Sequence, residues 1–360
     1  MTTRRGFLAS LLAASSLPTL GWAAAGAPAW IAAARAPGGD FALFGLDAGG
    51  AETFRVALPA RGHAGAGHPT RAEAVAFARR PGTFALVVDC ARGAVRHRLS
   101  PPEGVHFNGH GVFIHDGAVL ATVEQQADDS RGQIGFWDVA AGYRRMGAAP
   151  TGGIGPHDLR LMPDGRTLVV ANGGIATDPS DRRKLNLDTM RPNLGYLDLE
   201  GAPLEQVALA PDLWKNSIRH LAVRGDGLVG FAMQWQGALS DPVPLLGLHR
   251  RGAAPVLAAA PGAQGLAMRG YAGSIAFAGD GAEVAITSPR GGRVQRFTPE
   301  GAFLGEMARA DVCGLAAHPD GLLASDGLGA LIVLSAGRPR LAARHDLAWD
   351  NHIVTLPRTA

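Results

Sequence analysis

A single strand–turn–strand pattern recurs along the 360-residue chain, and it limits the possible folds more than any other feature. Its clearest copy runs from Gly155 to Asn172 and consists of a short apolar run, the turn Pro163-Asp164-Gly165, and a second run rich in β-branched residues. Apolar runs on either side of an Asp-Gly turn predict a β-hairpin. The first strand of the pattern opens with a histidine, and the second ends on a polar side chain. Further copies open near residues 68–75 and at His110, His220, Ser274 and Cys313.

The two ends of the chain complement each other. The runs 30–36, 41–47 and 52–59 match the last three strands of a four-stranded repeat, but no first strand precedes them. The run 352–356 begins the same pattern and then stops. Pairing between these two ends would complete one blade and close a ring that has no free sheet edges between blades. With this shared blade the count is seven, so we predict an all-β, seven-bladed β-propeller that spans residues 26–360 as a single domain.

The composition fits many short strands joined by turns. The chain has 50 glycines and 24 prolines, and its hydrophobic fraction of 47% is too high for a disordered protein. The net charge is only +3, and no Lys/Arg cluster is interleaved with aromatic residues, so we expect no nucleic-acid partner. Two cysteines, Cys90 and Cys313, do not make a disulfide framework. We expect the protein to be a monomer.

The N-terminus has the pattern of an export signal. Arg4 and Arg5 precede a moderately apolar stretch that ends in small residues near positions 23–25. A twin arginine in this position is typical of a Tat signal. A membrane anchor is the alternative, but the apolar run is short and is interrupted by serines and Pro18. We therefore expect a cleaved Tat signal over residues 1–25, a periplasmic protein, and no membrane span in the mature chain.

The recurring polar positions predict a site at the central channel. Antiparallel pairing places the start of each first strand and the end of each second strand on one face, where the inner strands converge. Several imidazoles in a confined space suit iron, copper or zinc, and nearby acids and amides can orient the rings. The predicted metal ligands are His110, His157, His220 and His352, with Cys313 and His68 as weaker candidates. The predicted surrounding polar groups are Asp89, Glu124, Asn172, Gln234, Ser288 and Asp326.

A structural role is the alternative for these histidines, since polar residues at such positions often cap a propeller channel by hydrogen bonding. Their spacing also raises a difficulty. His110 and His220 lie seven residues before the turn glycine, whereas His157 lies eight before it. A one-residue slip reverses a side chain in a strand, so a bulge or wider turn must compensate. Cys313 is explained equally well as a small core residue. Six further histidines fall in predicted loops or turns and are expected to be solvated: His63, His97, His106, His249, His318 and His345.

Three long loops follow second strands and should cover the same face. They span residues 125–133, 173–194 and 235–246. The middle loop carries a basic group that could form a lid over an anionic ligand, although a solvated loop is the alternative. This basic group consists of Arg182, Arg183, Lys184 and Arg191.

Several stretches of the sequence resemble a family of Tat-exported bacterial seven-bladed propellers. They are the GHG…DG…VEQ hairpin with its DDSRGQIGFWD continuation, and above all GPHDL…PDG…VVANGGI…KLNLDTMRPNLGYLD. Members of that family tend to be encoded beside imelysin-like and haem peroxidase-like proteins linked to iron acquisition. The resemblance therefore implies a metal-related periplasmic role with an iron-uptake or haem protein as partner, and it implies no particular reaction. The chain is also broadly similar to YVTN-type and lactonase-like propellers.

Three functions stay open at this point, and so does the question of enzymatic activity. The first is a metal-binding or metal-relay protein with iron or copper at the histidines. The second is a non-catalytic module that docks a periplasmic partner through its long loops. The third is a lactonase-like hydrolase, in which Glu124 or Asp326 beside His157 would act as general base. The G-x-S-x-G, H-E-x-x-H, P-loop and C-x-x-C signatures are all missing from the sequence.

Overall fold

The computed structural model describes residues 20–79, 82–181 and 183–357. Most of the predicted export signal, including Arg4 and Arg5, lies outside the described residues. The same is true of Arg182 in the predicted lid.

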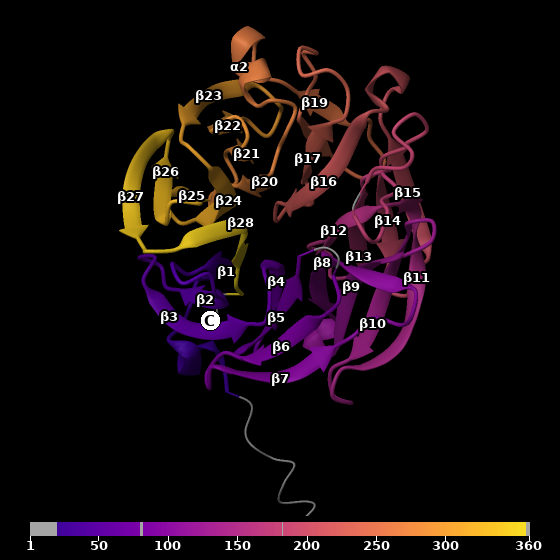
Figure 1. Cartoon of the computed structure of the whole chain (residues 1–360). Coiled ribbons are helices and arrows are strands. Elements are labelled where there is room, and N and C mark those ends of the chain that lie inside the picture. Colours follow the sequence, from indigo (N-terminus) through magenta and orange to yellow (C-terminus); the bar gives the residue numbers. More distant parts are fainter. Residues whose placement is uncertain (1–19, 80–81, 182, 358–360) are drawn as a thin grey trace, which may run out of the picture.

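Seven antiparallel sheets of four strands each form a ring around a central channel (Figure 1), which confirms the predicted seven-bladed propeller. From the innermost strand outward, blade 1 consists of β28 (Ala348–Thr355), β1 (Trp30–Arg35), β2 (Phe41–Leu46) and β3 (Glu52–Leu58). Blade 2 consists of β4 (Gly62–Gly67), β5 (Glu73–Ala78), β6 (Ala85–Asp89) and β7 (Ala94–Leu99). Blade 3 consists of β8 (Val105–Ile114), β9 (Val119–Gln126), β10 (Arg131–Asp138) and β11 (Arg144–Ile154).

The remaining four blades follow in chain order. Blade 4 has β12 (Pro156–Leu161), β13 (Thr167–Asn172), β14 (Asn193–Asp198) and β15 (Pro203–Ala208), and blade 5 has β16 (Asn216–Val223), β17 (Val229–Trp235), β18 (Leu246–His249) and β19 (Val256–Ala258). Blade 6 has β20 (Ser274–Phe277), β21 (Val284–Ser288), β22 (Arg293–Phe297) and β23 (Phe303–Ala308), and blade 7 has β24 (Val312–His318), β25 (Gly321–Asp326), β26 (Ala330–Ser335) and β27 (Arg338–Arg344).

The helices are short and lie between strands. They are η1 (Trp22–Ala25), η2 (His115–Gly117), η3 (Pro211–Leu213) and α2 (Gly262–Ala267). None of the helices within the described residues has the length and apolar character needed to cross a membrane.

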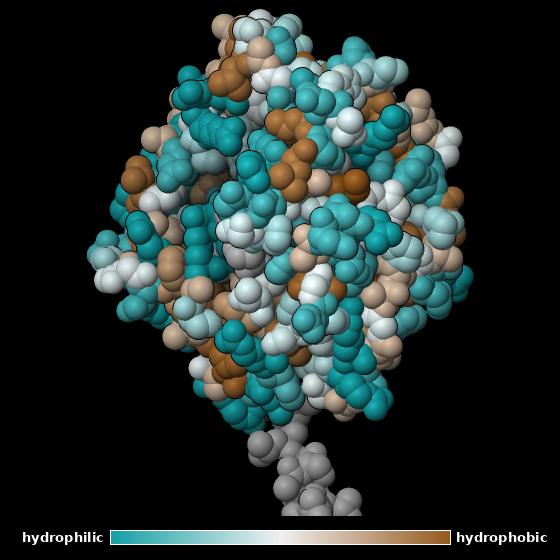
Figure 2. Space-filling model, turned by 45° about the vertical axis from the view of Figure 1, so that its right-hand side comes forward, coloured by the Kyte–Doolittle hydropathy of each residue, from teal (hydrophilic) through white to brown (hydrophobic). Residues whose placement is uncertain are grey.

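The hydrophobic core lies between neighbouring blades. Between blades 2 and 3, for example, Phe77, Phe107 and Leu120 are at most 1% exposed, and the two phenylalanine rings meet edge to face at 6.3 Å. Burying one such side chain contributes about 1.5–3 kcal/mol relative to leaving it exposed. On the face shown in Figure 2, hydrophobic side chains are scattered among hydrophilic ones. This face therefore offers no broad apolar area of the kind that obligate interfaces bury.

The C-terminal strand closes the ring as predicted. β28 pairs antiparallel with β1, with Trp30 opposite Thr355 and Arg35 opposite Ala348. Trp349 is 4% exposed and packs edge to face on Phe44, with ring centroids 5.6 Å apart. One blade thus contains both ends of the described chain, so the N-terminal blade cannot be completed until the last strand has been made.

Blade 2 begins one strand earlier than the sequence suggested. Its inner strand β4 has the sequence GHAGAG, whose glycines and small side chains give no strand signal. The sequence therefore predicts the next run, now seen as β5, to be the first strand, although it is the second, since Gly62 pairs with Ala78 and Gly67 with Ala74. Asp89 consequently ends the third strand of its blade and lies at the opposite face from the one predicted.

A tryptophan from the expected signal region packs into the core. Trp22 is 1% exposed, and its indole Nε1 donates a hydrogen bond to the carbonyl oxygen of His68 at 2.9 Å. We expect a chain that starts at Leu20 to have a higher free energy of unfolding than one that starts at Gly26, by about 3–5 kcal/mol, the range measured for removing a buried Trp side chain. Urea unfolding of both chains measures the difference. Identical midpoints would show that η1 adds nothing to the fold.

Ring closure can be tested by deleting residues 348–360. The opened ring leaves β1 without its partner and uncovers the apolar side chains between blades 1 and 7, so we expect a lower melting temperature for the whole domain. A synthetic peptide with the β28 sequence should restore the original melting temperature by strand addition, and a scrambled peptide should not. Circular dichroism measures the melting temperature of the deletion variant alone, with the β28 peptide and with the scrambled peptide. A deletion that leaves the melting temperature unchanged would contradict the closure.

Candidate metal site in the central channel

Five histidines from five successive inner strands meet in the channel. They are His352 on β28, His63 on β4, His110 on β8, His157 on β12 and His220 on β16, and each is at most 7% exposed. The centroids of contacting rings lie 4.5–5.8 Å apart. We call this group the histidine cluster. It contains two groups of three whose ligand nitrogens lie within 4.8 Å of one another: His63, His110 and His352, and His110, His157 and His220.

A β-bulge accompanies every histidine of the cluster. In β8 the pairing register jumps between Phe107 and Gly111, and in β12 it jumps between Pro156 and Asp158. An extra residue in one strand bends it and re-aims its side chains. Such irregularities compensate for the spacing to the turn glycine, which is seven residues from His110 and His220 but eight from His157. The histidine side chains can therefore point at one centre. The same irregularity occurs beside His63, His220 and His352.

Gly109 makes room for the cluster. Its φ is +91°, and a Cβ atom at this position would lie 2.5 Å from Cδ2 of His63. Glycine alone combines this backbone conformation with this close approach. The blade 2 histidine can therefore pack directly against the inner strand of blade 3.

Asp158 is the acidic member of the site among the described residues, and it is not predicted from the sequence because it resembles an ordinary strand residue. It is 1% exposed, and its Oδ1 lies 3.1 Å from Nδ1 of His110. Its Oδ2 accepts hydrogen bonds from the Leu221 amide at 2.9 Å and from Arg160 at 3.2 Å. Burial alone would raise the pKa of Asp158. Arg160 and His110 lower it by a larger amount, so the net pKa is far below the usual range.

The ionised Asp158 fixes the state of His110. A carboxylate can only accept a hydrogen bond, so Nδ1 of His110 must carry the proton. Its Nε2 has no hydrogen-bond partner among the described residues, and in the neutral ring this nitrogen carries the lone pair. A carboxylate that holds one imidazole nitrogen while the other points at a shared centre is the usual support of a metal-binding histidine.

Three other members of the cluster are held neutral. Burial is the main reason that the pKa values of His63, His220 and His352 lie well below the ordinary value, and the neighbouring histidines lower them further. Each also has one ring nitrogen without a hydrogen-bond partner in the described part of the chain: Nδ1 of His63, Nδ1 of His220 and Nε2 of His352. Unpaired buried polar atoms are unfavourable. The cluster therefore places several unused nitrogen atoms in a space that one metal ion could fill.

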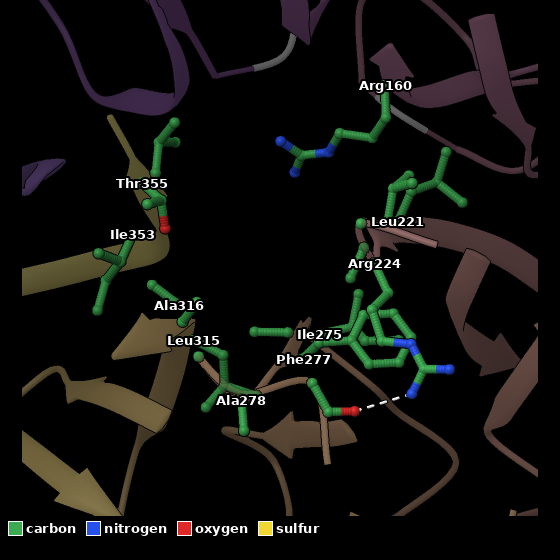
Figure 3. A pocket seen from close by; sticks show the side chains of 18 of the residues that line it. Arg160, Leu221, Arg224, Ile275, Phe277, Ala278, Leu315, Ala316, Ile353 and Thr355 are labelled. Atoms are coloured by element: carbon green, nitrogen blue, oxygen red, sulfur yellow. Dashed lines mark hydrogen bonds between the residues drawn. The ribbon is translucent and has the colours of Figure 1, made fainter. Parts of the chain in front are cut away.

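The cluster lies between two cavities. The narrow cavity, about 80 Å³, is on the face where inner strands start, and its wall includes His63, His157 and His220. The wide cavity, about 790 Å³, is on the face where inner strands end. Figure 3 shows apolar side chains on its wall, including Leu221, Phe277 and Ile353, and the Arg160 side chain that projects into it. Arg160 thus connects the wide cavity to Asp158.

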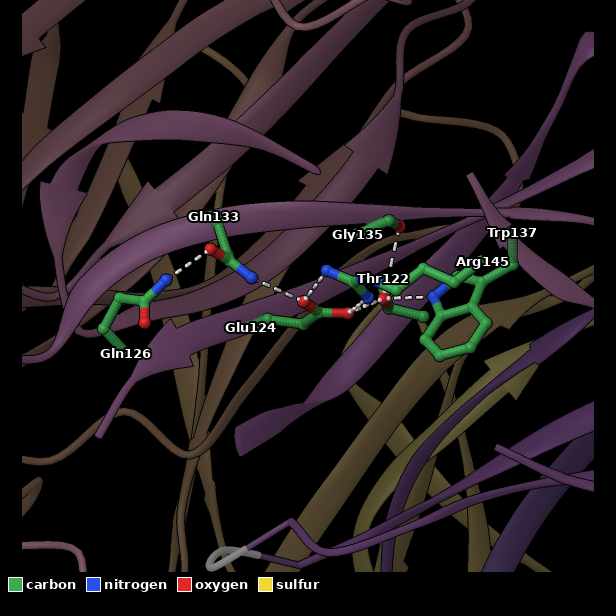
Figure 4. A network of polar contacts seen from close by, with 7 residues as sticks. All are labelled: Thr122, Glu124, Gln126, Gln133, Gly135, Trp137 and Arg145. Carbon is green, nitrogen blue, oxygen red and sulfur yellow. Dashed lines mark hydrogen bonds and ion pairs between the residues drawn. The ribbon is translucent and has the colours of Figure 1, made fainter. Parts of the chain in front are cut away.

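Most of the predicted surrounding polar groups stabilise individual blades. Figure 4 shows that Glu124 accepts two hydrogen bonds from Arg145, at 2.7 and 2.8 Å, and others from Thr122 and Gln133. Asp326 accepts a hydrogen bond from Nε of Arg309 at 2.6 Å. Local contacts also engage Ser288 with the Met268 carbonyl and Asp89 with Arg92. Asn172 instead links two blades, because it donates to Asn193 in its own blade and accepts from Thr151 on β11 of blade 3. Of the six predicted groups, Gln234 lines the narrow cavity beside the histidines.

The two weaker ligand candidates do not join the cluster. His68 lies beyond the opposite end of β4 from His63, where its Nδ1 accepts hydrogen bonds from the amides of Thr70 and Arg71. Burial lowers the pKa of His68 to about 4. Cys313 is 3% exposed, and its thiol donates to the Asp350 carbonyl at 3.3 Å. Burial raises the pKa of this thiol to about 12, so it is not a thiolate at neutral pH.

The expectation that the remaining histidines are solvated is wrong for three of them. His63 is 7% exposed and belongs to the cluster, because the blade containing it starts one strand earlier than predicted. His249 is 1% exposed and bonds to the Tyr196 hydroxyl at 2.7 Å, and His318 is 6% exposed and stacks on Trp30. The sequence signal for His63 is the pair Gly62-His63, which matches the pair Gly109-His110 in the next blade.

One residue of the predicted lid, Lys184, lies close enough to Arg219 of the narrow cavity for the two charges to interact, but it does not line the cavity. Lys184 donates a hydrogen bond to Gln236, and burial together with Arg219 and Arg290 lowers its pKa. Arg183 pairs instead with Asp178 at 3.6 Å, and Arg191 is exposed.

The fold and the site together define a seven-bladed β-propeller with a buried histidine cluster that could hold a metal ion. The sequence matches the family described as "Protein of unknown function (DUF1513)" over residues 56–356, so the chain belongs to that family. A search of curated proteins finds no match. A chain of Kuenenia stuttgartiensis hydrazine synthase is similar in structure, with a TM-score of 0.58 and 13% identity over 85% of this chain and 89% of that one. At this identity the likeness shows the fold alone.

Stability should fall as the solution becomes acidic. The histidines with lowered pKa take up protons only on unfolding, so the unfolded state binds more protons below about pH 6.5. Their contribution to stability is therefore complete above that pH and is lost as the pH drops. Each contributes a slope of up to about 1.4 kcal/mol per pH unit. Urea unfolding of His352→Gln between pH 7.5 and 5.5 should show a slope smaller by about this amount.

The control for this experiment is Leu341→Ala, which changes an exposed, uncharged side chain and should keep the wild-type slope. Equal slopes for wild type and His352→Gln would mean that His352 binds its proton equally well in the folded state.

Proposed function

We propose that the protein binds one first-row transition-metal ion, iron or copper, at the histidine cluster. The observation that carries the proposal is the convergence of buried imidazoles in two groups of three. Within the described residues, four of them have one ring nitrogen without a hydrogen-bond partner: His63, His110, His220 and His352. Imidazole nitrogen suits copper, iron, nickel and zinc, and it does not suit calcium or magnesium. On affinity alone this ligand set favours Cu(II), so binding of Fe(II) would depend on which metal is available to the protein.

The geometry supports a single ion. His110 belongs to both groups of three, but its Nδ1 is engaged by Asp158, so only Nε2 can bind a metal. One nitrogen serves one ion at a time. The two groups are therefore alternative positions for the same ion, which also supports the idea of a relay that passes an ion from one side of the channel to the other.

The cellular role is part of the proposal. We infer a periplasmic protein that supports iron acquisition or redox chemistry together with an iron-uptake or haem protein. Support comes from the Arg4-Arg5 pair and from the resemblance to exported propellers described above. Tat export transports folded proteins, so it would allow a metal to be bound before translocation. A hydrolase is less well supported, because its candidate bases Glu124 and Asp326 are held in ion pairs with Arg145 and Arg309.

Calorimetric titration tests the metal site. We expect wild type to bind Cu(II) or, under anaerobic conditions, Fe(II) with a stoichiometry of one, and His110→Ala/His220→Ala to bind at least about 100-fold more weakly. The matched control is His106→Ala/His115→Ala, which removes one half-buried and one exposed histidine outside the cluster. Asp158→Asn should weaken binding by about 10- to 100-fold, because the replacement cannot hold His110 in the same state.

A titration with Zn(II) shows whether the site discriminates among metals. Weak and equal binding by wild type and the double variant would leave the histidines as structural caps of the channel. The docking module would then be the better interpretation of the fold.

A further inference from the structure

A buried arginine without an acidic partner lies beside the histidine cluster. Arg219 precedes His220 in β16, is 6% exposed and lines the narrow cavity. Its Nε has no hydrogen-bond partner in the described part of the chain, and no acidic side chain there forms an ion pair with it. A guanidinium group stays protonated at neutral pH, so Arg219 is a buried cation. An unpaired buried charge costs several kcal/mol, which implies a missing counter-charge.

The same cavity has further positive charge on its wall. Arg79 follows β5, and its Nη1 lies 3.8 Å from Oδ1 of Asp350, beyond hydrogen-bond distance. Asp350 is already engaged by Nε of Arg61. Lys184 adds a third cation close enough to Arg219 for the two charges to disfavour each other. Among the described residues, the wall of the cavity therefore carries two guanidinium groups, those of Arg79 and Arg219, and no carboxylate.

We propose that the narrow cavity binds a small oxyanion or carboxylate between the guanidinium groups of Arg219 and Arg79. The volume of about 80 Å³ is several times the roughly 10–15 Å³ of probe space that one water needs, so an anion of three to six heavy atoms fits. Guanidinium groups form paired hydrogen bonds with both kinds of anion. Gln234, Tyr271 and Asn351 line the same space and supply additional polar groups.

The anion would also lie against His157 and His220, on the side of the cluster where a metal ion could accept another ligand. A metal bound by neutral imidazoles adds buried positive charge next to Arg219, and an anion would neutralise part of it. We therefore expect each ligand to tighten binding of the other by the same factor. This coupling rests on the proposed metal function, whereas the anion site itself does not.

The first test uses metal-free protein and two probes, inorganic phosphate and oxalate. We expect saturable binding of at least one of them by calorimetry, with a matching rise in melting temperature. Arg219→Gln should bind at least tenfold more weakly, and Arg219→Lys should retain part of the affinity because it keeps the charge and loses the paired geometry. Arg166→Gln, which changes an exposed arginine elsewhere, should bind as wild type does.

Replacing a buried arginine can itself alter stability. The quantity compared between wild type and each variant is therefore the rise in melting temperature that the anion causes in that protein. Lack of saturable binding of both probes, or equal binding by wild type and Arg219→Gln, would overturn the proposal.

The second test repeats the metal titration with and without the anion. If the anion binds but does not change the metal affinity, the anion site is supported and the proposed coupling between anion and metal is wrong. Anion binding by a protein that binds no metal would overturn the proposed function and leave the anion site standing.

Discussion

Pairing between β28 and β1 is the contact on which both the fold and the candidate site depend. It closes the ring, and it also brings His352 from the end of the chain against His63 from near its start, with ring centroids 4.5 Å apart. The five histidines are supplied by five successive blades, so none of the groups of three exists until the inner strands have been placed around one axis. A channel site in a closed ring therefore requires the whole domain to be folded, because loss of one blade would displace its neighbours as well.

The sequence predicted the ring well, because each hairpin carries its own turn and its own apolar alternation. It predicted four of the five clustered histidines for the same reason. His63 was missed because strand propensity fails for GHAGAG, where packing against neighbouring blades, rather than β-branched side chains, determines the strand. The polar strand ends were assigned to the site from their position alone. Position gives the face of the sheet, but it does not show that Glu124 turns to Arg145 within its own blade. Such a choice depends on partners that are distant in sequence.

Charge balance explains how the parts of the channel fit together. Asp158 is the only acid in contact with the cluster among the described residues, and Arg160 already offsets its charge. Burial lowers the pKa values of His63, His220 and His352, which favours neutral rings that keep their lone pairs and cannot compensate a cation. A divalent metal at this place would therefore be a nearly uncompensated buried charge, and Arg219 adds another. Filling the narrow cavity with an anion lowers the electrostatic cost of both.

The two cavities differ in the route that they offer to a metal ion. The narrow cavity has cationic walls at Arg79 and Arg219, which repel a free cation and attract an anion or an anionic complex. The wide cavity is larger and has both polar and apolar walls, and its wall includes Arg160, whose guanidinium is paired with Asp158. A free ion entering there would have to displace that guanidinium, whereas a chelated ion entering at the narrow side would be drawn in with its own ligand. If the cluster holds the proposed metal ion, the charges of the channel favour its delivery as an anionic complex from the face that carries the long loops.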